Sequence, residues 1–224
     1  VLSDLFVGQE IALRELNLDL TELEKNQLGV ALNGTFFEAP IQISGQITDL
    51  NTANHLTMKV EASGLAFASV WDYLNMQGPF LGELEQLDAT FDGSIDYPAG
   101  WKGTAQATLK ELNIDGQPLG QVAFEANATD GQARLVLGAN FDDKNSLFLD
   151  ATGKLPDTLA GFVHTQADGH LNFQIPDVGR LALPEPLAGD LSIQGIFSTS
   201  NGLLRTDLKV TSHTLAAAEA ELTE

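Results

Sequence analysis

The sequence predicts an all-β fold: a long, curled antiparallel sheet with one apolar and one polar face, built from two similar repeats and carrying one short helix near residues 67–76. Three observations predict it. Apolar and polar residues alternate with a period of two along most of the chain, dipeptides typical of tight turns recur, and one phrase of nine residues occurs twice. Strands that alternate strictly keep one face in water, which is typical of antiparallel sheets.

The repeated phrase divides the chain into two parts. Residues 11–19 read IALRELNLD and residues 107–115 read ATLKELNID, and further similar segments follow each copy in the same order. The further matches are 28–34 with 133–139, 40–47 with 146–155, 55–65 with 169–178, and 82–84 with 189–191. A self-match of this kind indicates a repeat architecture. We expect a first β repeat over 1–105 and a second over 106–224, with longer loops in the second, as parts of one continuous groove.

Each alternating run is expected to form a strand with one buried face. The runs are 28–32, 41–43, 56–62, 122–128, 135–141, 147–151, 171–175 and 204–210. The repeated phrase contains a slip in the period, which falls on Arg14-Glu15 in the first copy and on Lys110-Glu111 in the second. An extra residue in a strand forms a β-bulge, which bends the strand, so both copies predict a bulge that curls the sheet.

One segment has a helical period instead. Phe67, Val70, Trp71 and Leu74 stand at i, i+3, i+4 and i+7, which predicts a short helix that packs as a lid on the sheet. The matching place in the second repeat, 177–181, is shorter and predicts one helical turn or a loop.

Six dipeptides tolerate the positive φ angles of tight hairpins and are expected to mark turns. They are Asn33-Gly34, Asp92-Gly93, Asp115-Gly116, Asp130-Gly131, Asp168-Gly169 and Asn201-Gly202.

The composition of the chain argues against some classes of function. The chain has 31 Asp and Glu against 11 Lys and Arg, a net charge of −20, which argues against nucleic acid as a partner. There is no cysteine, and no apolar run approaches the ~20 residues of a membrane-spanning helix. The sequence begins at Val1 without Met and ends within an alternating pattern, so we expect an interior piece of a longer protein.

No pattern typical of catalysis is present. The four histidines stand in separate contexts, and no nucleophile, phosphate-binding or dinucleotide-binding motif occurs. The segment 142–145 (DDKN) is the nearest approach to a calcium loop, but it is short and contains a lysine. We therefore expect neither an enzyme nor a cofactor nor a metal site.

The pattern resembles the AsmA/TamB superfamily of bacterial envelope proteins. The residues that carry the resemblance are LTMKVEASGLAFASVWDYLNMQGPFLGELEQLDATFDG (56–93), GHLNFQIPDVGRLALPEPLAGDLSIQG (169–195) and the phrases LRELNLD and LKELNID. It covers nearly all of the chain, without the family's membrane helix or its C-terminal domain. The resemblance implies a U-shaped groove in the periplasm that carries phospholipid acyl chains between the inner and outer membranes.

Three classes of function remain open. A lipid conduit would have acyl chains, flanking segments of the same long protein and an inner-membrane anchor as partners. A scaffold or chaperone module would assist assembly of an outer-membrane β-barrel or autotransporter through a sheet edge. An inert structural module would close two sheet faces into a dry sandwich.

The inward apolar positions are the candidate lipid-binding residues. They are Val30, Leu32, Ile41, Ile43, Met58, Val60, Phe124, Leu135, Leu137, Leu147, Leu149, Phe173, Ile175, Leu191, Ile193, Leu208 and Val210.

Overall fold

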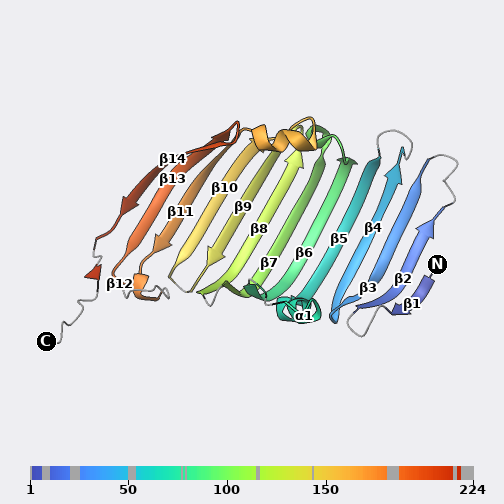
Figure 1. Ribbon diagram of the computed structural model, residues 1–224, viewed down its shortest axis with the longest axis horizontal. Coiled ribbons are helices and arrows are strands. Elements are labelled where there is room, and N and C mark those ends of the chain that lie inside the picture. Colours follow the sequence, from blue (N-terminus) through green and yellow to red (C-terminus); the bar gives the residue numbers. More distant parts are fainter. Residues whose placement is uncertain are drawn as a thin grey trace.

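One antiparallel sheet makes up most of the molecule. The computed structural model describes residues 2–6, 11–20, 26–49, 54–76, 78, 80–114, 117–142, 144–180, 187–213 and 216–217. The strands of the sheet lie side by side in chain order, β1-β2-β3-β4-β5-β6-β7-β8-β9-β10-β11-β13-β14, and β12 pairs separately with β15 (Figure 1). The predicted all-β antiparallel sheet is confirmed.

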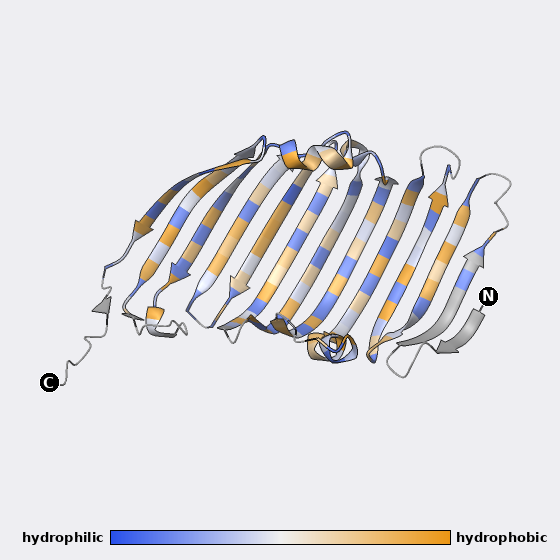
Figure 2. Ribbon diagram, viewed as in Figure 1, coloured by the Kyte–Doolittle hydropathy of each residue, from blue (hydrophilic) through white to orange (hydrophobic). Residues whose placement is uncertain are grey.

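The elements follow the alternating runs of the sequence. The strands are β1 (Leu2–Phe6), β2 (Ile11–Asp19), β3 (Leu28–Phe36), β4 (Ala39–Thr48), β5 (His55–Ala66), β6 (Phe80–Ser94), β7 (Lys102–Ile114), β8 (Gln117–Thr129), β9 (Gln132–Asn140), β10 (Ser146–Lys154), β11 (Ala167–Ile175), β12 (Leu187–Ala188), β13 (Leu191–Ser200), β14 (Leu203–Thr211) and β15 (Ala216–Ala217). The helices are α1 (Phe67–Tyr73) and the 3-10 turns η2 (Pro98–Gly100), η3 (Leu159–His164) and η4 (Val178–Arg180). Figure 2 shows the alternation as bands of opposite hydropathy along the strands that it colours.

The helices lie at the two edges where the strands end. We call these the α1 edge, where β5 ends and β6 begins, and the η3 edge, where β10 ends and β11 begins. Because the strands are antiparallel and joined in order, η2 lies at the η3 edge and η4 at the α1 edge. A backbone hydrogen bond from Ala99 N to Pro156 O (2.9 Å) ties η2 to the segment that leads into η3.

The helix α1 is confirmed but ends at Tyr73, before the expected 76. Asn75 adopts a left-handed conformation (φ 51°). The Met76 N–H then donates to Trp71 O (3.0 Å) and the Asn75 N–H to Asp72 O (3.0 Å), which is the Schellman pattern that terminates helices. The expected helical turn in the second repeat is η4.

Both predicted bulges are present. The pairing of β2 with β3 shifts between Leu13 and Glu15, and the pairing of β7 with β8 shifts after Leu109. Glu111 takes a left-handed conformation there (φ 53°), as the extra residue of a bulge allows. Both bulges lie toward the α1 edge, so both strands bend near the same edge of the sheet.

The turn dipeptides behave in two ways. Asp130-Gly131 and Asn201-Gly202 form the expected hairpin turns with positive φ at both residues. The prediction is wrong for Asn33-Gly34, Asp92-Gly93 and Asp168-Gly169, which lie inside β3, β6 and β11. All three glycines occupy apolar-face positions, and at Gly93 and Gly169 a side chain would collide with a neighbouring ring. A Cβ on Gly169, for example, would stand 2.3 Å from the Phe197 ring. Asp115-Gly116 lies outside the described residues.

The two copies of the repeated phrase occupy strands that run in opposite directions. They form β2 and the second half of β7, which stand five places apart in an antiparallel sheet. The later matches, β3 with β9 through β6 with β13, stand six places apart and run the same way. The added length in the second part is a strand, β8, rather than longer loops. The repeat boundary at 105/106 lies within β7, so the sheet continues across it.

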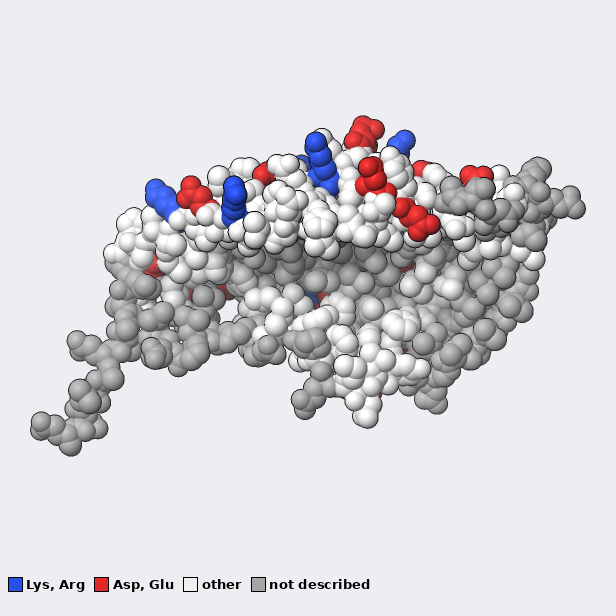
Figure 3. Space-filling view, turned by 45° about the horizontal axis from the view of Figure 1, so that its top comes forward, with Lys and Arg blue, Asp and Glu red and all other residues white. Residues whose placement is uncertain are grey.

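No second sheet covers this one in the described part of the chain. The large sheet runs from edge strand β1 to edge strand β14 without closing, and the only other pairing there is the short one between β12 and β15. The closed-sandwich alternative does not fit this arrangement. The charged side chains that Figure 3 shows in colour stand mainly along one surface of the sheet.

Candidate functional site

One face of the sheet is apolar across all the strands from β3 to β14. Residues that pair directly across strands share a face. One such row across the sheet is Leu32, Ile43, Val60, Ala89, Ala105, Ala126, Leu135, Ala151, Gly169, Phe197 and Thr206. We call the surface made by this row and its parallel neighbours on the same side the apolar face.

The opposite face is polar. The neighbouring row on that face reads Asn33, Gln42, Glu61, Asp88, Gln106, Glu125, Val136, Asp150, His170, Ile196 and Asp207. No Asp, Glu, Lys or Arg occupies a regularly paired apolar-face position of strands β3 to β14. From β3 to β14, the charged residues that the structure describes are therefore confined to one side of the sheet, to the bulges and to the loops.

All the candidate lipid-binding residues named above lie on the apolar face. Most of them are half-buried, because they touch one another but no second layer covers them. Ile175 is the most enclosed, at 2% exposed, beside the turn η4. Leu208 and Val210 are 48% and 59% exposed because β14 is an edge strand. Their role in holding lipid stays a prediction.

The apolar face is packed toward the α1 edge. Leu112, Val122 and Ala139 form a buried cluster there, at 7%, 7% and 3% exposed. Partly buried side chains surround it: Phe80, Leu109, Leu119, Leu137, Phe141 and Leu147. This edge therefore holds the main core of the molecule.

The helix α1 covers the same edge with aromatic rings. Phe67 and Trp71 both stack edge-on against Phe80, at centroid distances of 4.9 and 5.2 Å. The Trp71 indole N–H donates to the Phe80 carbonyl (2.7 Å), so its polar group is satisfied. The expected role of this helix as a lid packed on the sheet agrees with these contacts.

Toward the η3 edge the apolar face is open and floored by small residues. A cavity of about 580 Å³ lies there. Its floor consists of Ala89, Gly103, Ala105, Ala126, Ala128, Ala133, Ala151, Gly153 and Ala167, and larger side chains stand around it: Phe91, Trp101, Leu135, Leu155 and Phe162. We call this cavity the η3 hollow. Its size is within the range of ligand pockets, roughly 300–1,000 Å³.

Two aromatic residues border the η3 hollow. Trp101 follows η2 and its indole N–H donates to the Ser94 carbonyl (2.7 Å), which fixes the ring. The ring lies 5.5 Å from Phe91 and 5.9 Å from Phe162 of η3. Sequence reasoning missed Trp101, Phe162 and the small-residue floor. The alternate alanines of 105–107 and 126–128 could have indicated the floor, but pairing of distant strands sets its extent.

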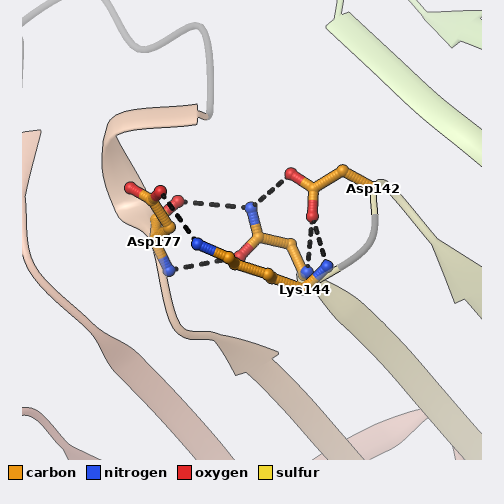
Figure 4. A network of polar contacts seen from close by, with 4 residues as sticks. Asp142, Lys144 and Asp177 are labelled. Atoms are coloured by element: carbon orange, nitrogen blue, oxygen red, sulfur yellow. Dashed lines mark hydrogen bonds and ion pairs between the residues drawn. The ribbon is translucent and has the colours of Figure 1, made fainter.

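A polar network ties the β9–β10 connection to the start of η4 (Figure 4). Asn145 is fully buried, and its side-chain amide donates to Asp142 Oδ2 (3.0 Å) and to the Asp177 carbonyl (3.2 Å). In return, the Asp177 N–H donates to Asn145 Oδ1 (3.4 Å). Asp142 Oδ1 also accepts the backbone N–H groups of Lys144 and Asn145, both at 2.7 Å. Asn145 therefore fastens the turn that holds Ile175 and Val178 against the apolar face.

Replacing Asn145 with alanine is expected to destabilise the fold by about 1–3 kcal/mol, because it leaves the part-buried backbone groups of Asp177 without their partner. Urea unfolding of the variant measures the loss. Asn127→Ala, on the exposed polar face of β8, is the control and should change stability little. Equal stability of the two variants would contradict the fastening role.

The polar face carries ion pairs, of which Arg134 with Asp150 is the best formed. Arg134 donates to both carboxylate oxygens, at 2.9 and 2.7 Å. These hydrogen bonds, together with the charge of Arg134, hold the pKa of Asp150 below its ordinary value against a partial desolvation that raises it. This bidentate pair joins β9 to β10 on the side away from the apolar face.

The lowered pKa of Asp150 predicts a small dependence of stability on pH. The ionised Asp150 carboxylate stabilises the folded state. This stabilisation is fully present above the unfolded-state pKa of Asp150 and is lost as the pH falls through the lower folded-state pKa. We expect the difference in urea midpoint between the wild type and Asp150→Asn to be constant near neutrality and to vanish in acid. The effect is small because water screens the pair. A difference that grows in acid would contradict this assignment.

Comparisons with known proteins add no assignment: no family model, no curated protein and no solved structure matches the chain. Within the described ranges, no helix has the length and apolar character needed to cross a membrane. No three His, Asp or Glu side chains among the described residues lie close enough together to hold a metal ion.

Proposed function

We propose that the chain is a segment of a periplasm-spanning groove protein that shields phospholipid acyl chains during transport between the inner and outer membranes. The observation that carries the proposal is the apolar face, which runs without a charged side chain from β3 to β14 and is not covered by a second layer in the described part of the chain. The resemblance of the sequence to the AsmA/TamB superfamily supports the same function.

The physical argument is the exposed apolar area. Soluble monomers rarely expose contiguous apolar patches beyond a few hundred Å². Here the inward side chains of eleven successive strands, β3 to β11 with β13 and β14, are half-buried at best over most of the face. Each methylene group that such a surface removes from water gains about 0.8 kcal/mol. An acyl chain that lies on the apolar face would therefore be stabilised by the area that it removes from water.

The arrangement of charge supports an amphiphile rather than a wholly apolar ligand. With no charge on the apolar face, a lipid headgroup finds polar partners only at the open edges, where the loops and strand ends carry charged residues. Acyl chains would lie across the strands, along the rows of the apolar face. The outer, polar face keeps the segment in solution in the periplasm.

Partners beyond lipid follow from the same proposal. Within the described ranges, the outer sides of the edge strands β1 and β14 pair with no further strand of the large sheet, and we propose that flanking segments of the same long protein pair with them. An inner-membrane anchor and an outer-membrane barrel protein would lie at the ends of that longer sheet. The proposed function involves no enzymatic step, no cofactor and no nucleic acid.

The proposal predicts that the purified chain extracts phospholipid from vesicles. Vesicles that contain a self-quenched, acyl-labelled fluorescent phospholipid should brighten when the chain is added. Met58→Glu places a charge on the apolar face and should reduce the extraction several-fold, since an unpaired charge beside an acyl chain is costly. Lys59→Glu changes the adjacent residue on the polar face and should leave extraction unchanged. No extraction by the wild type would overturn the proposal.

A second candidate function rests on β14. Every residue of this edge strand, Leu203 to Thr211, is exposed, and its outer side is unpaired in the described sheet. An exposed edge can accept a further strand, as a scaffold for outer-membrane barrel or autotransporter strands would. This function predicts photo-crosslinks from Lys209, at this edge, to an outer-membrane protein strand. Crosslinks only to segments of the same protein would favour the lipid conduit.

A further inference from the structure

Three strands in the second part of the chain carry large apolar side chains on the polar face as well. By strand register, Val136 of β9, Phe148 of β10 and Ile196 of β13 lie in the rows of the polar face. Phe148 is 44% exposed and Ile196 is 54% exposed. Each of these strands therefore contains an unbroken apolar run, such as Leu147-Phe148-Leu149 in β10. Unbroken runs are typical of strands that are covered on both faces.

The matching positions in the first part of the chain are polar. In β4, Gln42 pairs with Asn33 of β3. At the matching place, Phe148 of β10 pairs with Gly138 of β9. Two neighbouring polar side chains are thus replaced by an exposed ring and by a residue without a side chain. The second part of the chain therefore has a feature on its polar face that its structural counterpart lacks.

Gly138 leaves an open depression beside Phe148. A Cβ at Gly138 would meet no atom within 4 Å, and the backbone there is not left-handed. At other strand glycines, such as Gly45 and Gly195, an added Cβ would stand 2.6 and 2.4 Å from a backbone carbonyl oxygen. The fold therefore does not require a glycine at 138, although glycine weakens a strand interior. A glycine of this kind often marks a place where another molecule approaches closely.

The charge of these strands favours a second copy of the same chain as the molecule that approaches. A net charge of −20 opposes association between copies. The strands β3 to β7 contain six acidic and three basic side chains, whereas β8, β9, β10, β11, β13 and β14 contain four of each. The balanced set consists of Glu125, Asp150, Asp168, Asp207, Arg134, Lys154, Arg205 and Lys209.

The polar face of these six strands is large enough for a contact between two copies. Each strand has at least nine residues, and the strands are neighbours in one sheet. With about 4.8 Å between strands and about 3.3 Å per residue, the face measures roughly 24 by 30 Å. This is roughly 700 Å², close to the ~800 Å² that each partner buries in a standard interface. We therefore expect an affinity in the micromolar range.

We propose that the polar face of β8 to β14 is an interface between two copies of this chain, with the Phe148 ring of each copy seated over Gly138 of the other. A two-fold axis parallel to the strands and between β9 and β10 produces this exchange, because the ring and the depression lie side by side on paired strands. Val136, two residues from Gly138, and Ile196, two strands from Phe148, extend the apolar contact. The apolar faces of the two copies point away from each other, so the interface does not depend on the proposed lipid function.

Sedimentation velocity of the purified chain, from low micromolar to submillimolar concentration, tests the interface. The weight-average mass should rise from that of one chain toward that of two. Phe148→Gln and Gly138→Asn introduce the residues of the matching positions in β4 and β3. Each should weaken the dimer by roughly ten-fold or more, as truncation of an interface hot spot does. Gln42→Ala, on the polar face of β4, is the control and should leave the dimer unchanged.

Both variants are expected to keep the fold, since Phe148 is exposed and Gly138 has open space above it. Far-UV circular dichroism and urea unfolding check this. Vesicle extraction should be the same in both variants as in the wild type, because the changes lie on the face opposite the apolar one. A chain that is monomeric at every concentration, or a dimer that neither folded variant weakens, would overturn the interface and leave the proposed function untouched.

A photoreactive residue at position 148 of the intact protein identifies the occupant in cells. We expect an adduct that joins two copies of the same protein. An adduct with a different protein alone would overturn the second copy as the occupant and assign the face to that protein. If the wild-type chain extracts no phospholipid but forms the dimer that Phe148→Gln weakens, the interface stands and the proposed function fails.

Discussion

Replacing Ile43 with aspartate is expected to stop lipid passage through the intact protein while the sheet stays folded. Ile43 lies on the apolar face midway along β4, between Leu32 of β3 and Val60 of β5, and is half-buried. On an open face the carboxylate keeps contact with water, so its cost to stability is about 1–2 kcal/mol. A charge in the path of an acyl chain must be desolvated whenever a chain passes, which blocks movement.

Gln42→Asp is the matched control, because it introduces the same group one residue away on the polar face. We expect it to leave both lipid passage and stability unchanged. Circular dichroism and urea unfolding of the purified chain report the fold, and phospholipid delivery to the outer membrane of cells reports passage. Global unfolding of the Ile43→Asp chain would show that the apolar face is sealed, and the lipid-conduit account would then fail.

The opposite outcome is expected at Val122, where aspartate should unfold the chain. Val122 is 7% exposed and belongs to the buried cluster with Leu112 and Ala139 at the α1 edge. A carboxylate there has neither water nor a partner, so we expect a loss of about 4 kcal/mol or more. Ala123→Asp, on the polar face of the same strand, should cost little. Urea midpoints measure both.

Comparison of Val122→Asp with Ile43→Asp tests the asymmetry of the apolar face. A large loss at Val122 and a small one at Ile43 is the pattern of a face that is packed at one edge and open elsewhere. Equal small losses at both would contradict the packed cluster.

Much of the fold follows from local sequence patterns. The period of two sets which residues share a face, because a pleated strand points successive side chains to opposite sides. It therefore placed Ile43, Leu137 and Phe173 on one face without knowledge of the strand order. The slips at Arg14 and Lys110 indicated bulges for the same reason, since one extra residue reverses the alternation.

The errors have physical causes that a local pattern does not contain. Asp168-Gly169 resembles a hairpin turn, but the glycine lies within β11, where it leaves room for Phe197 of β13. The space available to a side chain depends on which strand lies beside it. The pairing of strands that are distant in sequence is set by the tertiary structure and is not visible in a local pattern. The repeated phrase likewise falls on β2 and β7, whose opposite directions depend on the number of strands between them.

The candidate site was predicted in part. Large apolar residues in alternation can be recognised in the sequence, so the sequence predicted the parts of the apolar face that they fill. A cavity cannot be recognised in this way. The η3 hollow exists because Ala105, Ala126 and Gly153 have small side chains or none, and the sequence does not show that their strands lie next to one another. Trp101 and Phe162 come from loops outside the alternating runs, and η2 and η3 bring them together.

Site-specific photo-crosslinking in living cells tests the central claim most directly. Photoreactive residues are placed in the intact protein on the apolar face at Ile43, Leu137 and Phe173, and on the polar face at Gln42, Val136 and Asn172. The account predicts phospholipid adducts at the first three positions and none at the other three. An absence of adducts at all six, or equal adducts on both faces, would contradict an open groove that holds lipid.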